Sequence, residues 1–208
     1  MSNGRVEDGD AARLYHRLTC YGPRIDFPAP PADHPLVLQN FVANDVARWP
    51  PQYKRYDVGP RLPLPTDWDM GGPAATVLAG QYATSEVRDL PALARLLFLA
   101  AGVVMTGKRS QNRVVLFRAA GSAGGRFPLE LYVAARGIAG LHDGVYWYDP
   151  VQHALLRIAA PPTVGATTLI VTGVPWRTGW RYGERGWRHI YWDGGTMLAH
   201  ILALAGPA

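Results

Sequence analysis

The chain has one cysteine, Cys20, so no disulfide can form within it. A single thiol is typical of a reducing compartment, where disulfides are rare. The longest apolar run, Leu96 to Met105, is too short to cross a bilayer. The polar start, Met1 to Asp8, lacks the apolar core of a signal peptide. We therefore expect a soluble, cytoplasmic protein that does not enter a membrane.

Spacings that mark several enzyme classes are also missing. The histidines are scattered, and no Cys-x-x-Cys or His-Glu-x-x-His pair is present, so we expect no metal site. Gly121-Ser122-Ala123-Gly124 does not match the Gly-x-Ser-x-Gly pattern of many hydrolases. A dinucleotide fingerprint needs a helix after its glycines, whereas a strand is expected here. These three classes are disfavoured.

Charge is modest, with 21 Lys and Arg against 16 Asp and Glu, a formal net charge of +5. This excess suits an anionic ligand such as a phosphate and does not require a nucleic acid. Hydrophobic residues make up 48% and charged residues 18%, which indicates a globular protein with an apolar core. A chain of 208 residues fits one domain, or one domain with an arm.

Proline recurs from Gly22 to Pro73 and excludes long helices and central strands there. Flexible linkers seldom carry many aromatic residues, so we expect an extended arm laid on a partner surface. We interpret residues 1–73 as an N-terminal extension and residues 74–208 as the folded domain. The expected aromatic anchors of the arm are Phe27, Phe41, Trp49, Tyr53, Tyr56 and Trp68.

Helices are expected in three places. The first is short, Ala11 to Thr19. The second has Asp89 as N-cap and Pro91 in its first turn, and it ends near Gly102. The third is capped by Asp193. Apolar residues at helical spacing mark the inner faces of the second helix (Leu93, Leu96, Leu97, Ala100, Ala101) and the third (Met197, Leu198, Ile201, Leu202).

Strands are expected at Leu129 to Ala135, Val145 to Tyr148, Ala154 to Ile158 and Thr167 to Thr172, from alternation and β-branched content. The polar, basic segment Thr106 to Arg113 is expected to be a loop. The mixture predicts an α+β fold.

A glycine-rich loop precedes the strand expected at Leu129. Gly121, Gly124 and Gly125 permit backbone conformations that are closed to other residues, and they let a ligand approach closely. Successive N–H groups in such a loop can hold an anion or a polar ring edge. An ordinary turn before a strand explains the glycines as well. Arg118 leads into this loop and is a candidate to bind a cofactor or the loop carboxylates, with a surface ion pair as the alternative.

Short motifs follow one another in order: Ser122-Ala123-Gly124, Pro128 to Val133, Gly144 to Pro150, and His153-Ala154-Leu155. In this order they resemble the SagB/ThcOx-type dehydrogenases of the nitroreductase superfamily. Other parts of the chain are similar to the same family, namely Leu14 to Thr19, Tyr53 to Tyr56, Arg61 to Pro65, Pro175 to Arg188 and Asp193 to Thr196. The resemblance implies a nitroreductase-like fold, an antiparallel-rich mixed sheet flanked by helices.

The resemblance also implies a function. Such proteins are FMN-dependent and oxidise thiazoline or oxazoline rings of modified peptides to azoles, by removal of a carbon-bound proton and hydride transfer to flavin N5. Ser122, Ala123, Gly124 and Gly125 would then line the flavin edge. The implied partners are a modified peptide, a second copy or a complementing chain at a shared site, and a cyclodehydratase complex.

Four arginines interleave with aromatic residues between Trp176 and Arg188, a pattern that suits stacking and phosphate binding. It fits a single-stranded nucleic acid or an interlocked structural turn equally. This segment resembles a Lys-Tyr-Gly-x-Arg-x-Tyr-Arg motif whose Lys-Tyr pair is associated with catalysis, and the match falls on Arg181 and Tyr182. Tyr182 is thus a candidate for proton removal or orientation, whereas Arg181 cannot be a base because guanidinium stays protonated.

Three departures from the family favour an alternative, a non-catalytic scaffold or peptide-binding subunit. The first is Arg181, where the family motif has a lysine. Gly80 to Ser85 lacks the arginines that grip the flavin phosphate, which leaves Lys108, Arg109 and Arg113 as substitutes. The chain also stops at Ala208, before a complete nitroreductase core would end, so we expect a C-terminally incomplete member. A nucleic-acid partner is not expected, because the net charge is small.

Overall fold

The computed structural model describes residues 9–19, 46–57, 59–68, 75–76, 79, 86–108, 114–161, 163 and 165–205. The expected anchors Phe27 and Phe41, the segment Gly80 to Ser85, Arg109, Arg113 and the proposed boundary at Pro73 lie outside these residues. The helices are α1 (Asp10–Thr19), α4 (Leu90–Ala101), α5 (Pro175–Tyr182) and α6 (Arg185–Leu204). The strands are β1 (Arg61–Pro63), β2 (Val103–Lys108), β3 (Val114–Arg118), β4 (Leu129–Ala135), β5 (Gly144–Asp149), β6 (Ala154–Ala159) and β7 (Thr168–Gly173).

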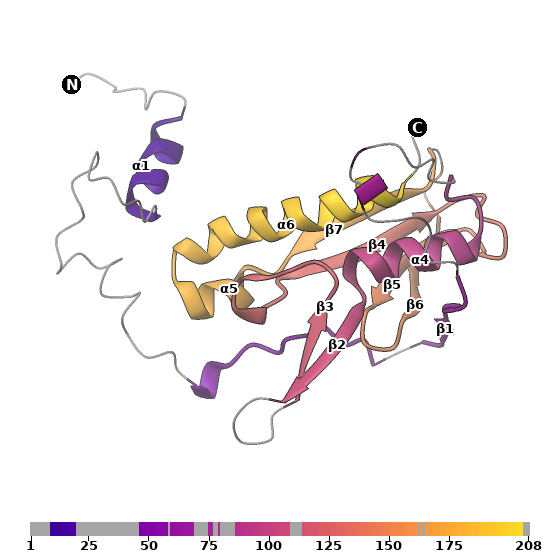
Figure 1. The fold of residues 1–208 in the computed structure, drawn as a ribbon, viewed down its shortest axis with the longest axis horizontal. Coiled ribbons are helices and arrows are strands. Elements are labelled where there is room, and N and C mark those ends of the chain that lie inside the picture. Colours follow the sequence, from indigo (N-terminus) through magenta and orange to yellow (C-terminus); the bar gives the residue numbers. More distant parts are fainter. Residues whose placement is uncertain are drawn as a thin grey trace.

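Five strands form one sheet in the order β1-β6-β5-β4-β7, and each neighbouring pair among them is antiparallel. The register of the central pair sets Tyr132 opposite Trp147. The strands β2 and β3 form a separate antiparallel hairpin that projects away from the sheet (Figure 1). The antiparallel-rich sheet flanked by helices is the fold class expected from the sequence, and β4 to β7 lie where strands were expected.

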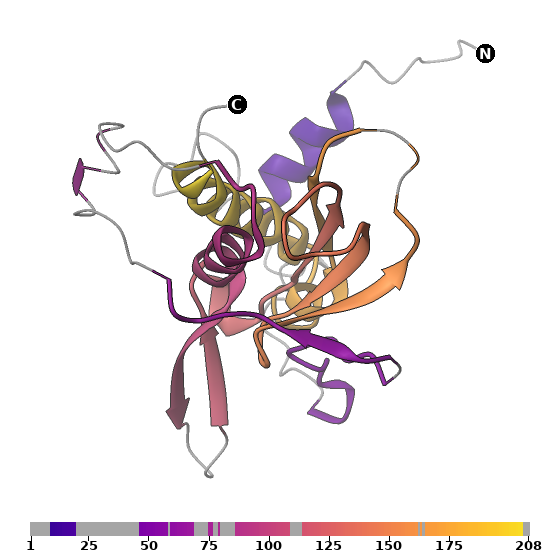
Figure 2. The same ribbon diagram turned by 90° about the vertical axis from the view of Figure 1, so that its right-hand side faces the viewer.

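Helices α4 and α6 lie side by side over one face of the sheet (Figure 2). Asp89 caps α4 by accepting a 2.8 Å hydrogen bond from the Ala92 N–H, and the Gly102 N–H ends the helix on the Phe98 carbonyl. The apolar spacing of α4 therefore produces one buried face, as expected. This face forms the core with alternate residues of the sheet and with two residues of α6, including Leu93, Leu97, Leu131, Val133, Tyr148, Met197 and Ile201.

The arm covers the other face of the sheet. The Lys54 Nζ donates a 3.0 Å hydrogen bond to the Tyr132 hydroxyl, and the Tyr56 ring lies 5.1 Å from the Trp147 ring. Farther along, the Arg61 Nε lies 3.1 Å from the Asp149 carboxylate. Residues 54–57 and 59–61 of the arm thus cover this chain's own sheet. The other expected anchors that the structure describes also pack on rings, Trp49 on Trp180, Tyr53 on Phe127, and Trp68 on Phe98.

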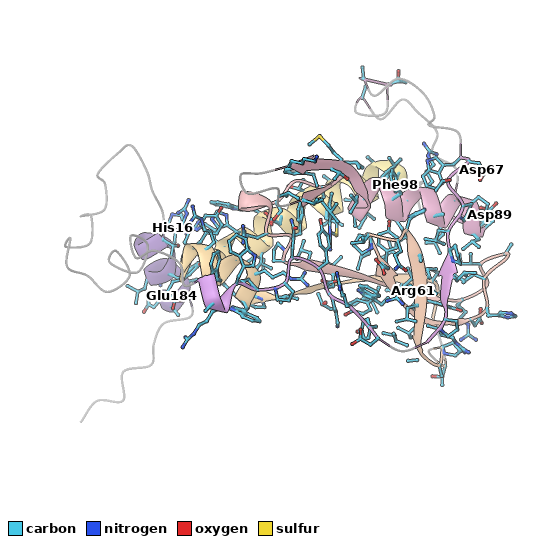
Figure 3. The ribbon with its side chains drawn as sticks, turned by 90° about the horizontal axis from the view of Figure 1, so that it is seen from below. His16, Arg61, Asp67, Asp89, Phe98 and Glu184 are labelled. Carbon is cyan, nitrogen blue, oxygen red and sulfur yellow. The ribbon has the colours of Figure 1, made fainter. Side chains whose placement is uncertain are left out.

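Helix α1 contacts the corner between α5 and α6. The Tyr15 hydroxyl donates to the Glu184 carbonyl at 3.0 Å, and the Arg188 Nη2 donates to the Thr19 Oγ1 at 2.8 Å. His16 and Glu184 accordingly lie at the same end of the molecule (Figure 3). An arginine near the last turn of α1 is favourable because it meets the negative end of the helix dipole.

The expected loop at Thr106 to Arg113 is wrong at its start. Thr106, Gly107 and Lys108 belong to β2, where they pair with Leu116, Val115 and Val114 of β3. The polar composition of this segment suggested a loop. It forms a strand because it pairs with the apolar strand β3, and strand pairing depends on cross-strand neighbours more than on local propensity.

The expected helix start at Asp193 is also wrong. Helix α6 begins at Arg185, so Asp193 lies in its middle, where its side chain is buried. Met197 and Ile201 face the core as expected, but Leu198 is 52% exposed and Leu202 is 66% exposed. Asp193 resembled an N-cap because aspartate is a common cap residue. Its carboxylate does accept hydrogen bonds, but from the distant glycine-rich loop and not from the helix's own first turn.

Candidate functional site

The glycine-rich loop is held to α6 by one carboxylate. Ser122 Oγ donates a 2.5 Å hydrogen bond to the Asp193 Oδ2, and the Ala123 N–H donates to the Oδ1 at 3.3 Å. The Ser122 Oγ also accepts a 2.8 Å bond from the Phe127 N–H, which closes the loop. Burial raises the pKa of the Asp193 carboxyl, and the bonds from Ser122 and Ala123 oppose that rise. The loop is thus fixed in place before any ligand arrives.

The backbone of this loop carries unusual geometry. Ala123–Gly125 form a single 3₁₀ turn in which Gly124 has φ of 59°. Phe127, a bulky and buried residue, has φ of 46°, which lies in the left-handed region that such residues rarely adopt. Strain of this kind persists only where the surroundings impose it, and it concentrates at functional sites.

Tyr182 lies against this loop. It ends α5, whose backbone packs so closely on α6 that a Cβ at Gly186 would collide with Gly179. That close approach brings the Tyr182 hydroxyl onto Gly124, where an added Cβ would also collide. Two groups that sequence analysis assigned to one site, the loop and Tyr182, are therefore adjacent in the structure. Arg181, the residue before Tyr182, is exposed.

His189 was not singled out by the sequence analysis. It lies one helical turn before Asp193 on α6, and its ring is 4.4 Å from the Tyr182 ring and 5.1 Å from that of Trp192. Neither ring nitrogen has a hydrogen-bond partner among the described residues. Burial lowers the pKa of His189, and the nearby Arg185 and Arg188 lower it further. The sequence did carry one signal for His189: its i, i+4 spacing from Asp193 places both residues on the same face of a helix.

Arg118 lies beneath the loop and is 6% exposed, so the alternative of a surface ion pair is wrong. Its Nη1 donates a 2.7 Å bond to the Leu129 carbonyl, and its guanidinium lies 4.9 Å from the Tyr53 ring. Its Nε and Nη2 have no hydrogen-bond partner in the part of the chain that the structure describes. Arg118, Ser122 and Asp193 line a void of about 10 Å³, room for about one water molecule.

Glu130 has a structural role. Its Oε1 lies 2.6 Å from the Arg177 Nη1, and its Oε2 accepts a 2.9 Å bond from the Trp147 indole. Arg177 also donates to the Phe127 carbonyl at 2.9 Å and to the Pro51 carbonyl at 3.0 Å. One buried ion pair therefore joins α5, β4, the glycine-rich loop and the arm.

The segment from Trp176 to Arg188 is helical, so the alternative of an interlocked turn is replaced by α5 and the start of α6. One of its tryptophans packs against the arm. Trp180 lies 4.7 Å from Trp49, and the Arg126 guanidinium lies 4.5 Å over the Trp49 ring and 5.4 Å from that of Trp180.

A cavity of about 170 Å³ opens between the arm and the glycine-rich loop. Gly124, Gly125 and Arg126 form one wall. The remaining lining comes from Trp49, Pro50 and Gln52 of the arm, Val114 and Val115 of β3, and Arg177. We call this space the arm cavity.

FMN fits the arm cavity in part. Small residues at Gly124 and Gly125 admit the edge of a planar ring, and two guanidinium groups are present. Sites that enclose molecules of this size measure about 300–1,000 Å³, so this cavity is too small for the whole cofactor. The N–H groups of Ala123, Gly125, Arg126 and Phe127 are already bonded within this chain. The described residues therefore offer one wall for a flavin and not a complete site.

Two further observations concern metals and membranes. Among the described residues, no group of three or more His, Cys, Asp or Glu side chains could hold a metal ion. No helix in the described part of the chain is both long and apolar enough to cross a membrane.

No protein-family model matches the chain. It is similar to a known protein in sequence and to crystal structures in fold. A Methanocaldococcus jannaschii protein is 29% identical over 140 residues, 60% of this chain and 66% of that protein. A crystal structure from Anabaena variabilis has a TM-score of 0.66 and 27% identity, over 92% of this chain and 38% of that one. One from Ralstonia eutropha, at 24% identity and a TM-score of 0.51, covers 69% of this chain and 70% of that one and shows the fold alone.

All three proteins are described as a “putative nitroreductase”. The fold of this chain is the α+β fold of nitroreductases. The likenesses in sequence and in fold are thus both to nitroreductase-like proteins. The chain spans 66% of the length of the Methanocaldococcus protein and 38% of the Anabaena chain.

Proposed function

We propose that this chain is an FMN-dependent oxidoreductase of the SagB/ThcOx type, which oxidises azoline rings of a modified peptide. One observation carries the proposal: on a nitroreductase-like fold, a strained glycine-rich loop lies between Tyr182 and a cavity that contains two arginines. The order of motifs along the chain supports the finer assignment to this type.

Each residue of the site has a defined task under this proposal. Gly124 and Gly125 admit the edge of the ring, while Ser122 and Asp193 hold the loop that carries them. A bound flavin supplies the hydride-accepting chemistry. The Tyr182 hydroxyl, next to Gly124, orients the peptide or takes up its proton. Arg181 stays protonated and contributes charge only.

A second polypeptide completes the site in this proposal, because the arm cavity encloses too little space for FMN. A second copy of the chain or a complementing chain would supply the remaining walls. The chain matches 38% of the Anabaena protein, so a longer polypeptide with the same fold provides a precedent for added parts. The natural setting that we propose is a complex with a cyclodehydratase, in the cytoplasm.

Purification with added FMN tests the cofactor assignment. We expect a yellow protein after gel filtration and quenching of flavin fluorescence on binding. A colourless protein that FMN does not reconstitute would contradict the proposal.

An azoline-containing peptide then tests the reaction. Its oxidation is monitored by mass spectrometry as the loss of two hydrogens. The variant Y182F keeps the ring but loses the hydroxyl, so it should bind FMN normally while the rate falls by about 10²–10⁴-fold. The variant Y191F is the matched control, because Tyr191 is exposed on α6. Equal loss in both variants would remove Tyr182 from the mechanism.

A non-catalytic scaffold is the second candidate. It is favoured by one observation, the internal bonding of the loop N–H groups at Ala123, Gly125, Arg126 and Phe127. A protein that stays colourless with FMN and yet binds a leader peptide would support it.

A further inference from the structure

We propose that the arm cavity binds an anionic group, a phosphate or a carboxylate, carried on a short apolar body. The proposal goes beyond the flavin assignment, because it concerns a charged ligand group and holds whether or not the chain retains a flavin.

The first support is charge. Arg126 and Arg177 are the charged residues among the described residues that line the cavity. Behind it lies the buried Arg118, near the ion pair between Arg177 and Glu130. Because buried charges are weakly screened, these cations favour an anion in the half-open space.

The second support is how the cations are held. The Arg126 guanidinium lies over the Trp49 ring and near the Trp180 ring, which limits its motion. Arg177 uses its Nε and Nη1 for the Pro51 carbonyl, the Phe127 carbonyl and Glu130. Among described residues its Nη2 has no hydrogen bond, and this nitrogen is not one of the fully enclosed ones. Guanidinium groups fixed in this way suit two-point recognition of phosphate or carboxylate oxygens.

The third support is the shape and lining of the cavity. The Gln52 Nε2 donates a 2.9 Å hydrogen bond to the Gly125 carbonyl, so the arm and the loop are tied across the cavity. Val114, Val115 and Pro50 provide apolar walls. A volume of about 170 Å³ accepts an acid group and a few carbon atoms. The ligand class is therefore a small organic acid or phosphate ester, or the acidic end of a larger molecule.

Isothermal titration of the full chain tests the proposal, at constant ionic strength with chloride as the balancing anion. The probes are inorganic phosphate and glutarate. We expect saturable binding of at least one probe, weakened about tenfold in R126Q, which corresponds to about 1.4 kcal/mol. The matched control R157Q removes an exposed arginine on β6 and should bind as the wild type does. Arg177 is left intact because it holds the fold.

A second comparison identifies the source of the anionic group. If the group is the phosphate of FMN, FMN should bind at least tenfold more tightly than riboflavin, and inorganic phosphate should compete with it. If the group is a carboxylate of another ligand, glutarate should bind, and FMN and riboflavin should bind equally tightly.

Two results would overturn the inference: no saturable binding of phosphate or glutarate to the wild type, or equal binding to R126Q and wild type. FMN binding without either anion would leave the proposed function in place and remove this site. Anion binding without FMN binding would support this site and contradict the proposed function.

Discussion

Ser122 and Asp193 are joined by a 2.5 Å hydrogen bond across 71 positions of sequence. The same hydroxyl accepts the Phe127 N–H, so one side chain links α6 to both ends of the glycine-rich loop. The geometry of the candidate site therefore depends on a polar contact between a loop and the middle of a helix. Most of what can be tested about the site follows from this contact and its neighbours.

Replacing Ser122 with alanine should loosen the loop. The change leaves the Asp193 Oδ2 and the Phe127 N–H without their present partner, which costs about 1–3 kcal/mol when the groups are buried. Urea unfolding followed by tryptophan fluorescence measures the loss. The control T163A removes an exposed hydroxyl and should change stability little. Equal midpoints for the two variants would show that the contact does not stabilise the fold.

The raised pKa of Asp193 predicts a pH dependence of stability. From its ordinary value near 3.8 up to the raised folded-state value, the folded chain holds a proton that the unfolded chain has released. Stability contributed by this group therefore falls as pH rises through that window and is constant above it. D193N cannot titrate, so the wild-type free energy of unfolding should fall relative to that of D193N over this window. A constant difference between the two proteins would contradict the raised pKa.

Gly124 and Gly121 form a matched pair. Gly124 has φ of 59°, and an added Cβ would collide with the Tyr182 hydroxyl, whereas Gly121 has no atom within 4 Å of that position. G124A should lose at least about 1–2 kcal/mol from backbone strain alone, and G121A should be nearly neutral. In the double variant G124A/Y182F the collision is relieved but the strain remains, so part of the stability should return. Thermal unfolding of the four proteins measures this, and equal losses in G124A and G121A would refute it.

The buried pair of Glu130 and Arg177 should be costly to break. E130Q leaves the Arg177 guanidinium buried without its counter-charge, which costs about 3–5 kcal/mol. The control E86Q removes the exposed ion pair between Glu86 and Arg88, which is worth little because solvent screens it. Denaturant midpoints compare the two. A loss in E130Q no larger than in E86Q would mean that another group compensates Arg177.

His189 predicts a pH dependence of opposite sign. Its pKa is lowered from an ordinary value of 6.5, so between the folded-state value and 6.5 the unfolded chain binds a proton that the folded chain does not. Stability should therefore rise with pH up to 6.5. H189F keeps an aromatic ring against Tyr182 and Trp192 but cannot titrate. The free energy of unfolding of H189F minus that of the wild type should be larger near about pH 5 than at neutral pH. A difference that does not change with pH would contradict the lowered pKa.

Local chemistry explains which elements the sequence predicts. Asp89, Pro91 and Gly102 mark both ends of α4 because capping acts within a few residues. The alternation of Leu129 to Ala135 predicts β4 with its bounds. Tyr182 and the glycine-rich loop were assigned to one site through the order of motifs, and the structure brings them together.

Long-range contacts explain the errors. Asp193 reads as a helix cap because a cap and a loop clamp use the same carboxylate chemistry, and only the fold decides between them. Lys108 reads as loop because its polar side chain gives no strand signal, and its pairing with Val114 appears only in the fold. A surface ion pair, the alternative considered for Arg118, is wrong because the burial of Arg118 depends on Tyr53 and Leu129, which sequence spacing does not place beside it.

The arm has a consequence for the order in which the molecule folds. Lys54 reaches Tyr132 across 78 positions, and Tyr56 reaches Trp147, so the arm has no docking surface until β4 and β5 have paired. Contacts between distant positions form slowly because the chain must first close a long loop. Arm docking should therefore be the last step of folding, and until it occurs Trp147 and Glu130 are open to water, chaperones and proteases.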